Sequence, residues 1–318
     1  MLRPMMGTMI KKPIIDPKVL EQLDKLGPDE LELFLLNRGN YRGALLSATR
    51  MMNEMRVNHN YGVLESLICG HAYLAAGLIS AGLKGQDRVG IEMDCDGPAG
   101  GFVVDASAGG SVRGYLRNAP IPIDTPPESF DTRPFIGDGT LSVTRFAEGS
   151  KQPFTGHISL AYGTVAQDLA NYYLQSEQTP TAFHLSVQFD TDGTIMGAGG
   201  LLVQAFPGAD EDIGKQLDTR IRNLPSLGGL VAAGADSSSI IHDYFHEFEA
   251  AEVGTREVRF DCGCSKDRFA RFLAAMPIDE IKEIRDQGPF PLQTVCHNCN
   301  TTYEFSQLEI ERAYQMSR

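Results

Sequence analysis

FDCGCSKDRF at residues 260–269 and VCHNCNTTYEF at residues 295–305 contain four of the six cysteines of this 318-residue chain. In an extended strand, residues i and i+2 point to the same face, so the two thiols of Cys-Gly-Cys can converge on one point. A tight Cys-x-x-Cys turn brings its two thiols together in the same way. Four thiolates around one centre suit tetrahedral zinc and leave no open position for a catalytic water. The sequence therefore predicts a structural or switching zinc site, with the ligands Cys262, Cys264, Cys296 and Cys299.

Other interpretations of these cysteines are open from the residues alone. The four could be buried or incidental thiols, and Cys-x-x-Cys is also the motif of thioredoxin-like redox proteins. A thioredoxin-like site needs the motif at a helix N-terminus after a strand, whereas the NTTYEF that follows Cys299 is typical of a strand. His297 could replace one sulfur ligand, although its place between two cysteines favours exposure to solvent.

Composition and charge narrow the class of protein. Hydrophobic residues make up 42% of the chain and charged residues 22%, both ordinary for a soluble globular protein of about two domains. The net charge of −13 disfavours nucleic acid and anionic membrane surfaces as partners, because both require a basic face. The N-terminal residues lack the continuous apolar stretch of a signal peptide. We therefore expect a cytoplasmic protein, whose thiols stay reduced.

The most apolar segment, residues 66–83, contains no Asp, Glu, Lys or Arg and barely reaches membrane-spanning length. Its glycine, serine and histidine residues favour a buried core helix instead. Cys69 in this segment and Cys95 on the apolar face of a strand are predicted to be buried core cysteines. Neither GDG at residues 137–139 nor GAGG at 197–200 completes a nucleotide-binding loop, so no nucleotide is expected.

The pattern along the chain predicts four segments and an α+β fold. Residues 1–28 are an extension with little pattern, and residues 29–208 are a core domain rich in antiparallel strands, which begins with a helical pattern from Asp29. Residues 209–255 are a helical linker, in which the weakly structured SLGGLVAAGADSSS separates two amphipathic helices. Residues 256–318 are a small C-terminal zinc-binding domain.

Local patterns predict several elements inside these segments. An apolar helix is predicted over about residues 63–83, and residues 89–95 alternate as in a half-buried strand. Thr164 begins a capping box at the start of one helix, and Ser306 begins another. Ser265 is predicted to cap a helix directly after the first cysteine pair.

Both cysteine stretches resemble the zinc domain of the thirty-three-kilodalton heat-shock protein family, the redox-regulated holdase chaperones. Further stretches resemble the core motifs of that family: DGPAGGFVVDASAGGSVRGYL at 96–116, FIGDGTLSVT at 135–144, YYLQSEQTPTAF at 172–183 and AGGLLVQAFP at 198–207. The similarity runs from about Asp29 to Phe305, which is most of the chain. The chain departs from the family pattern in its N-terminal extension and at Gly263, between the first two cysteines.

The resemblance implies both a function and a chemistry. It implies an ATP-independent holdase, and not an enzyme, that binds unfolding client proteins under stress and prevents their aggregation. It implies one Zn²⁺ in the reduced state, and on oxidation the disulfides Cys262–Cys264 and Cys296–Cys299 with release of the metal. The oxidised, active form is expected to be a homodimer. Nucleic acid, membrane and nucleotide are not expected as partners.

Loss of the zinc domain's fold would remove support from the linker. The linker helices carry apolar faces that would then become a client-binding surface. We expect clients to contact three residues of each helix: Ile213, Leu217 and Ile221 on the first, and Ile240, Tyr244 and Phe248 on the second.

Overall fold

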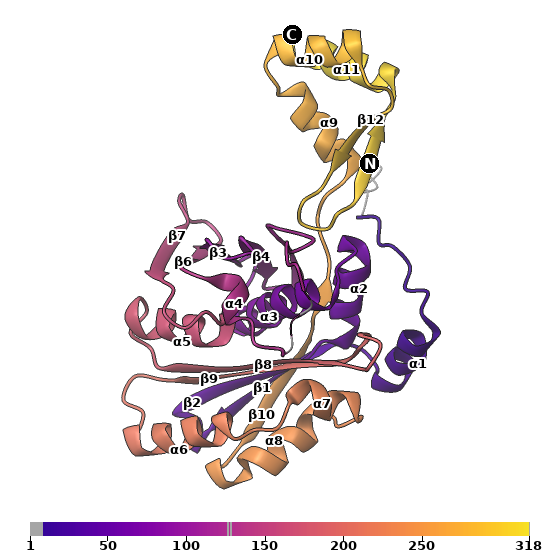
Figure 1. The fold of residues 1–318 in the computed structure, drawn as a ribbon. Helices are drawn as coiled ribbons and strands as arrows, with labels where there is room; N and C mark the ends of the chain where they lie inside the picture. Colours follow the sequence, from indigo (N-terminus) through magenta and orange to yellow (C-terminus); the bar gives the residue numbers. More distant parts are fainter. Residues whose placement is uncertain (1–8, 126, 128, 318) are drawn as a thin grey trace, which may run out of the picture. The chain divides into compact units, whose positions relative to one another are not determined.

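The computed structural model describes residues 9–125, 127 and 129–317. Its described residues divide into two compact units. The large unit spans residues 13–260, and the small unit contains residues 261–317 together with residues 9–12. Figure 1 shows that the large unit consists of two sheets with helices between them, and that further helices cover the outer face of one sheet.

The large unit is built on a five-stranded sheet in the order β10-β1-β2-β9-β8 and a six-stranded sheet in the order β11-β5-β4-β3-β6-β7. Neighbouring strands are antiparallel except for the parallel pair β11 and β5. The strands are β1 (Glu30–Leu36), β2 (Tyr41–Ser47), β3 (Arg88–Cys95), β4 (Gly101–Ser107), β5 (Ser111–Leu116), β6 (Gly139–Phe146), β7 (Phe154–Ser159), β8 (Thr181–Phe189), β9 (Ile195–Ala205), β10 (Ala251–Glu257) and β11 (Arg259–Phe260). The predicted α+β fold with a strand-rich antiparallel core is confirmed.

Helices pack on both faces of the five-stranded sheet (Figure 1). The helices of the large unit are α1 (Pro17–Leu26), α2 (Thr49–His59), α3 (Val63–Ile79), α4 (Arg133–Ile136), α5 (Val165–Gln175), α6 (Glu211–Arg222), α7 (Leu227–Ala232) and α8 (Ser237–Phe245), with 3-10 turns η1 (Asn37–Gly39), η2 (Ser80–Gly82) and η3 (His246–Phe248). The stretch Val63–Gly82 is long and apolar enough to cross a membrane, but 89% of its most apolar window is buried inside the protein. Because α3 contacts strands of both sheets, it is the predicted core helix.

Several local predictions for the large unit are confirmed. Alternate residues of β3, ending at Cys95, are buried, as the period-two pattern predicts. The hydroxyl of Thr164 accepts a hydrogen bond from the backbone N–H of Gln167 and caps α5 as predicted. The second bond of the predicted capping box is replaced, because the backbone N–H of Thr164 donates to the carboxylate of Asp168 and not to Gln167. Cys69 and Cys95 are free and buried core residues.

The helical pattern predicted from Asp29 is wrong for residues 30–36. Leu33 and Leu36 have helical spacing, but residues 30–36 form β1, which pairs with β2 on one side and with β10 on the other. Leu31, Phe34 and Leu36 are almost completely buried by this arrangement. Hydrogen bonding of this segment to two strands, one of them distant in sequence, outweighs its weak local preference for a helix.

Two stretches predicted to have little structure contain helices. Within residues 9–28, Asp16 caps α1, and the helix buries Val19 and Leu23; residues 1–8 lie outside the described part of the chain. The glycine-rich stretch in the linker contains α7. A Cβ atom at Gly228 would lie only 2.9 Å from the carbonyl oxygen of Ser186, so glycine is required for α7 to approach β8 this closely.

The small unit is a two-stranded hairpin with three short helices. Its elements are α9 (Lys266–Ala274), α10 (Ile278–Gln287), β12 (Leu292–Val295), β13 (Thr302–Phe305) and α11 (Gln307–Met316). Ser265 caps α9, and Ser306 forms a capping box with Glu309 at the start of α11, both as predicted. The buried apolar core is small and centres on Leu273, Ile281, Phe305 and Ile310. A unit of fewer than about 70 residues rarely gains sufficient stability from such a core alone.

Candidate metal centre and linker cluster

Four cysteine thiols meet in the small unit. The Sγ atoms of Cys262, Cys264, Cys296 and Cys299 all lie within 4.8 Å of one another, and the four residues are buried. The Sγ atoms of Cys264 and Cys299 are 3.4 Å apart, and those of Cys262 and Cys296 are 3.9 Å apart. These distances exceed the about 2.05 Å of a disulfide bond, so the thiols are free. The structure thus brings together the four residues that the sequence predicts as ligands.

The hairpin of the small unit determines the position of the second cysteine pair. Val295 at the end of β12 pairs with Thr302 at the start of β13, so the Cys-x-x-Cys segment forms the connecting turn. The carbonyl oxygen of Cys296 accepts hydrogen bonds from the backbone N–H groups of Cys299 at 3.2 Å and Asn300 at 2.7 Å. Asn300 has a φ of 53°, a left-handed conformation that asparagine tolerates better than most residues. The turn therefore brings both thiols to the same side.

Three neighbours of the thiols were missed by the sequence reasoning. The hydroxyl oxygen of Tyr303 is 3.2 Å from Sγ of Cys264, and the hydroxyl oxygen of Thr301 is 3.3 Å from Sγ of Cys299. The backbone N–H of Cys262 donates to Sδ of Met9 at 3.1 Å. Thr301, Tyr303 and the buried Phe305 are every second residue of TTYEF and therefore share one face of the strand. This spacing could have predicted that both hydroxyl groups lie beside the cysteines. No comparable sequence signal identifies Met9.

Ionisation of these thiols is coupled because they are so close. Contact with the thiols of Cys262 and Cys296 raises the pKa of Cys264 and, together with Cys264, that of Cys299. Contact with Cys262 also raises the pKa of Cys296, but hydrogen bonds with the thiols of Cys264 and Cys299 outweigh that effect and lower the value to about 7. A negative charge on one sulfur therefore opposes ionisation of the others. Four thiolates at these distances require a cation between them.

The donor set fits Zn²⁺. Tetrahedral coordination with Zn–S distances of about 2.3 Å places the sulfurs about 3.8 Å apart, close to the separations found here. Among the described residues, only the four cysteines form a group of three or more potential ligands close enough to share a metal ion. His297 is exposed and lies outside this group. The buried all-sulfur arrangement can hold a metal ion.

The position of the Cys-x-x-Cys turn also bears on the thioredoxin-like alternative. A thioredoxin-like thiol is activated at a helix N-terminus, where the helix dipole stabilises the thiolate. Here the segment between Cys296 and Cys299 connects β12 to β13 instead. The structure therefore lacks the local geometry on which that alternative depends.

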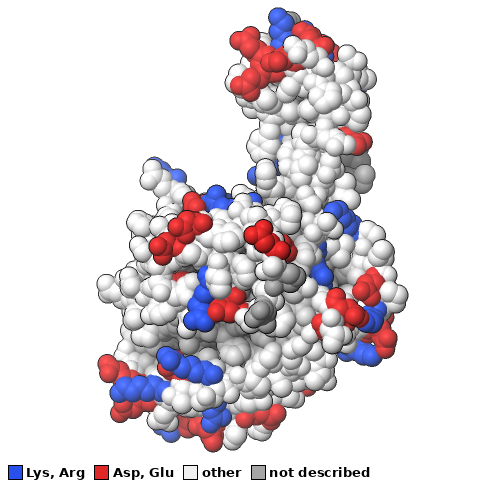
Figure 2. Space-filling model, in the orientation of Figure 1, with Lys and Arg blue, Asp and Glu red and all other residues white. Residues whose placement is uncertain are grey.

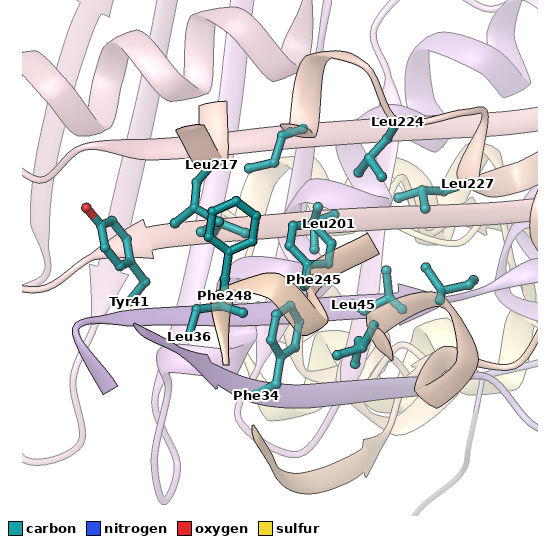
Figure 3. Packing of buried hydrophobic residues seen from close by; sticks show 14 residues of the cluster. Phe34, Leu36, Tyr41, Leu45, Leu201, Leu217, Leu224, Leu227, Phe245 and Phe248 are labelled. Carbon is teal, nitrogen blue, oxygen red and sulfur yellow. The ribbon is translucent and has the colours of Figure 1, made fainter. Parts of the chain in front are cut away.

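The residues predicted to bind clients lie in an apolar cluster of the large unit, which we call the linker cluster. On the linker side it contains Leu217, Ile221, Ile240 and Phe248, with Ile213 and Tyr244 packed against it. On the sheet side it contains residues of β1, β2 and β9, including Phe34, Leu45 and Leu201 (Figure 3). In this state the protein's own sheet covers the face that was predicted to bind clients.

Polar contacts fix the linker helices over the cluster. Asp210 caps α6 and Asp236 caps α8 through their side-chain oxygens. Arg220 pairs with Glu247 and donates to the carbonyl oxygen of Tyr244 at 3.0 Å, which joins α6 to the end of α8. Acidic and basic side chains are intermixed on the face of the large unit drawn in Figure 2, so charge does not single out one surface there.

The chain is similar to known proteins over most of its length. The family model described as Hsp33 protein matches residues 29–306. The 33 kDa chaperonin of Desulforamulus reducens is 34% identical over 286 residues, which cover 89% of this chain and 96% of that protein. The 33 kDa chaperonin of Latilactobacillus sakei subsp. sakei is 33% identical over 278 residues, which cover 86% and 94%.

A solved structure extends the similarity to the fold. The crystal structure of the 33 kDa chaperonin (heat shock protein 33 homolog) from Thermotoga maritima aligns with a TM-score of 0.81 and 27% sequence identity, over 91% of this chain and 98% of that one. The family match includes both sheets of the large unit and all four clustered cysteines. The resemblance predicted from the sequence motifs is therefore confirmed, and the chain belongs to the Hsp33 family of chaperones.

Proposed function

We propose that this chaperone is a redox-regulated, ATP-independent holdase of the cytoplasm. In the reduced state the linker cluster stays covered, and oxidation of the four clustered cysteines exposes a surface that binds unfolding proteins and prevents their aggregation. The observation that carries the proposal is the presence in one chain of a buried four-thiol cluster and a covered apolar linker. Membership of the Hsp33 family supports the chaperone role.

The thiol cluster supplies the chemistry of the switch. A Zn²⁺ ion held by the four cysteines would contribute folding free energy, about 10–16 kcal/mol in zinc-finger peptides. The thiolates that bind a metal are also the form of cysteine that peroxide attacks. Each pair of thiolates loses two electrons and forms one S–S bond, while one peroxide molecule accepts the electrons and two protons and leaves as two waters. We propose the pairs Cys262–Cys264 and Cys296–Cys299.

Oxidation would unfold the small unit because little else stabilises it. The sulfurs of a disulfide carry no negative charge, so the site loses its ligands. Each proposed disulfide closes only a short loop and connects residues that are already neighbours in sequence, so it constrains the unfolded chain little. The small apolar core around Leu273 and Phe305 then has to hold the unit alone.

Unfolding would reach the linker through the chain itself. Phe260, fully buried at the end of β11, stands two residues before Cys262. β11 is only two residues long, and β10 before it is an edge strand with mostly exposed side chains that pairs only with β1. Strands of this kind open at low free-energy cost. Loosening of β10 and β11 would remove the C-terminal anchor of the linker.

The exposed linker would have the chemistry that unfolded proteins require. Ile213, Leu217 and Ile221 from α6, with Ile240, Tyr244 and Phe248 from the second half of the linker, would present a broad apolar surface. We propose that the oxidised form binds clients through these residues as a homodimer. The proposal involves no nucleotide, nucleic acid or membrane.

Light scattering of a heat-denaturing client enzyme tests the proposal. The zinc-loaded, reduced protein and the peroxide-treated protein are each added without ATP. Only the oxidised protein should suppress aggregation, and it should release one Zn²⁺ per chain. Cys69→Ser with Cys95→Ser is the matched control, because these buried cysteines lie outside the cluster and their loss should leave the switch intact. Equal protection by both redox states would refute redox regulation, and protection by neither would refute the holdase function.

A further inference from the structure

A small cavity lies inside the large unit, next to β1 and β2. Its volume is about 220 Å³. Pockets for drug-sized ligands begin at about 300 Å³, so this cavity admits only a smaller molecule. Most of its wall is apolar and comes from β1, β2, β9 and the C-terminal end of α3, including Leu33, Leu35, Ala44, Leu78, Ile79 and Leu202.

One charged side chain of this cavity has no partner. Arg42 extends from β2, and its guanidinium group lies beside Gly82, where a Cβ atom would be 3.3 Å from both terminal nitrogens. The Nε atom of Arg42 is buried without a hydrogen-bond acceptor. No ion pair of Arg42 occurs within the described part of the chain. Burial lowers the pKa of Arg42 and outweighs the opposite effect of Tyr173 and Glu177, while the nearby charge of Arg145 lowers this pKa further. A partly buried cation in this environment is unfavourable until an anion joins it.

The groups next to Arg42 leave one positive charge in excess. Arg145 forms an ion pair with Glu177 at 2.7 Å, so this carboxylate is already used. Arg145 also donates to the hydroxyl oxygen of Tyr173 at 3.4 Å. Tyr173 is 2% exposed, and its own hydroxyl proton meets no acceptor among the described residues. The cavity therefore contains two donors, Arg42 and Tyr173, that need an acceptor.

We propose that this cavity binds a small amphipathic carboxylate, whose oxygens accept hydrogen bonds from Arg42 and Tyr173 and whose apolar tail contacts Leu33 and Leu78. A single negative charge balances the excess positive charge, and a planar carboxylate matches the planar guanidinium group. The apolar walls disfavour inorganic anions, which lose their hydration on entry without gaining contacts. The proposal is independent of the holdase function, because the cavity contains no cysteine and lies in the large unit.

Calorimetric titration of the reduced, zinc-loaded protein tests this assignment. The probes are hexanoate and hexylamine, which share a chain length and differ in the sign of their charge. Hexanoate should bind saturably with one site per chain, and hexylamine should not bind. Arg42→Met should weaken hexanoate binding at least tenfold, and its unfolding temperature should stay the same or rise because an unpaired cation is removed. Arg133→Met, which alters an exposed arginine of α4, should bind as the wild type does.

A second variant decides the matter if Arg42→Met fails to fold. Tyr173→Phe keeps the aromatic ring and removes only the hydroxyl group, so it should weaken hexanoate binding severalfold. Equal hexanoate affinity in Tyr173→Phe and the wild type would remove Tyr173 from the site and overturn the proposed geometry. Absence of saturable binding at about 10 mM hexanoate, above the about 1 mM range of weak specific binding, would show that the cavity holds only solvent. Equal binding of hexylamine would overturn the role of Arg42.

Discussion

Replacing Phe245 with alanine separates the burial of the linker from the redox state of the cysteines. Phe245 is 1% exposed in the linker cluster, and its ring centroid is 5.9 Å from that of Phe34 and 6.5 Å from that of Phe248. It lies in the large unit, and no cysteine is changed. If the covered linker keeps the protein inactive, this variant should bind clients even when it is reduced and zinc-loaded.

The expected magnitude follows from the burial of Phe245. Truncation of a fully buried phenylalanine to alanine costs about 3–5 kcal/mol. At about 1.4 kcal/mol for each factor of ten, the opening of the linker should become more frequent by about two to four orders of magnitude. A loss of this size falls within the about 5–15 kcal/mol that stabilises a typical domain, so the large unit should remain folded while the linker opens.

Limited proteolysis and client aggregation measure this effect together. The reduced variant should be cleaved faster within residues 209–255 than the wild type, and it should suppress aggregation while its zinc content stays at one per chain. Phe154→Ala is the matched control, because Phe154 on β7 is 62% exposed and its truncation should change stability by less than about 0.5 kcal/mol. Faster cleavage without client binding would show that exposure of the linker does not produce holdase activity.

Three further outcomes test other parts of the reasoning. Cys296→Ser should lower the zinc content and the melting temperature of the small unit, as measured by metal analysis and circular dichroism, because one of four thiolates is lost. Asp236→Ala should cost about 1 kcal/mol and speed cleavage of the linker at unchanged zinc content, because α8 loses its cap on the N–H of Ser239. Burial raises the pKa of Asp29 from 3.8 to about 7. Between these pH values Asp29 is protonated in the folded state and ionised in the unfolded state, so the free energy of unfolding falls as the pH rises toward 7. Urea unfolding of Asp29→Asn should therefore depend less on pH from about 4 to 7; an unchanged pH dependence would exclude this role for Asp29.

Local patterns predicted the parts of the fold that depend on near neighbours in sequence. The cap at Ser265, the capping box at Ser306 and the alternation along β3 each involve residues at most a few positions apart. The convergence of the cysteines was also predictable, because strand geometry and a tight turn fix each pair locally. Local geometry did not predict that the two cysteine pairs lie next to each other. That prediction required the assumption that both pairs bind the same metal ion.

The failures came from contacts between residues distant in sequence. Residues 30–36 form a strand because β2 and β10 flank them, and β10 lies more than 200 residues further along the chain. The helix α7 depends on the close approach of Gly228 to Ser186, which a glycine-rich sequence alone does not distinguish from a loose connector. The role proposed for Arg42 could not be predicted either, because arginine is common in strands and the sequence does not show that this one lines a cavity.

The location of the linker cluster limits how the proposed switch can operate. The apolar residues of α6 and α8 are covered by β1, β2 and β9 of the large unit. The signal therefore has to weaken the packing of the linker on its own sheet. The segment that can transmit it is the short run from β10 through β11 to Cys262, because it connects the end of the linker to the first thiol. If this is correct, lengthening the chain between Phe260 and Cys262 with a flexible glycine–serine insert should leave zinc binding intact and uncouple oxidation from exposure of the linker.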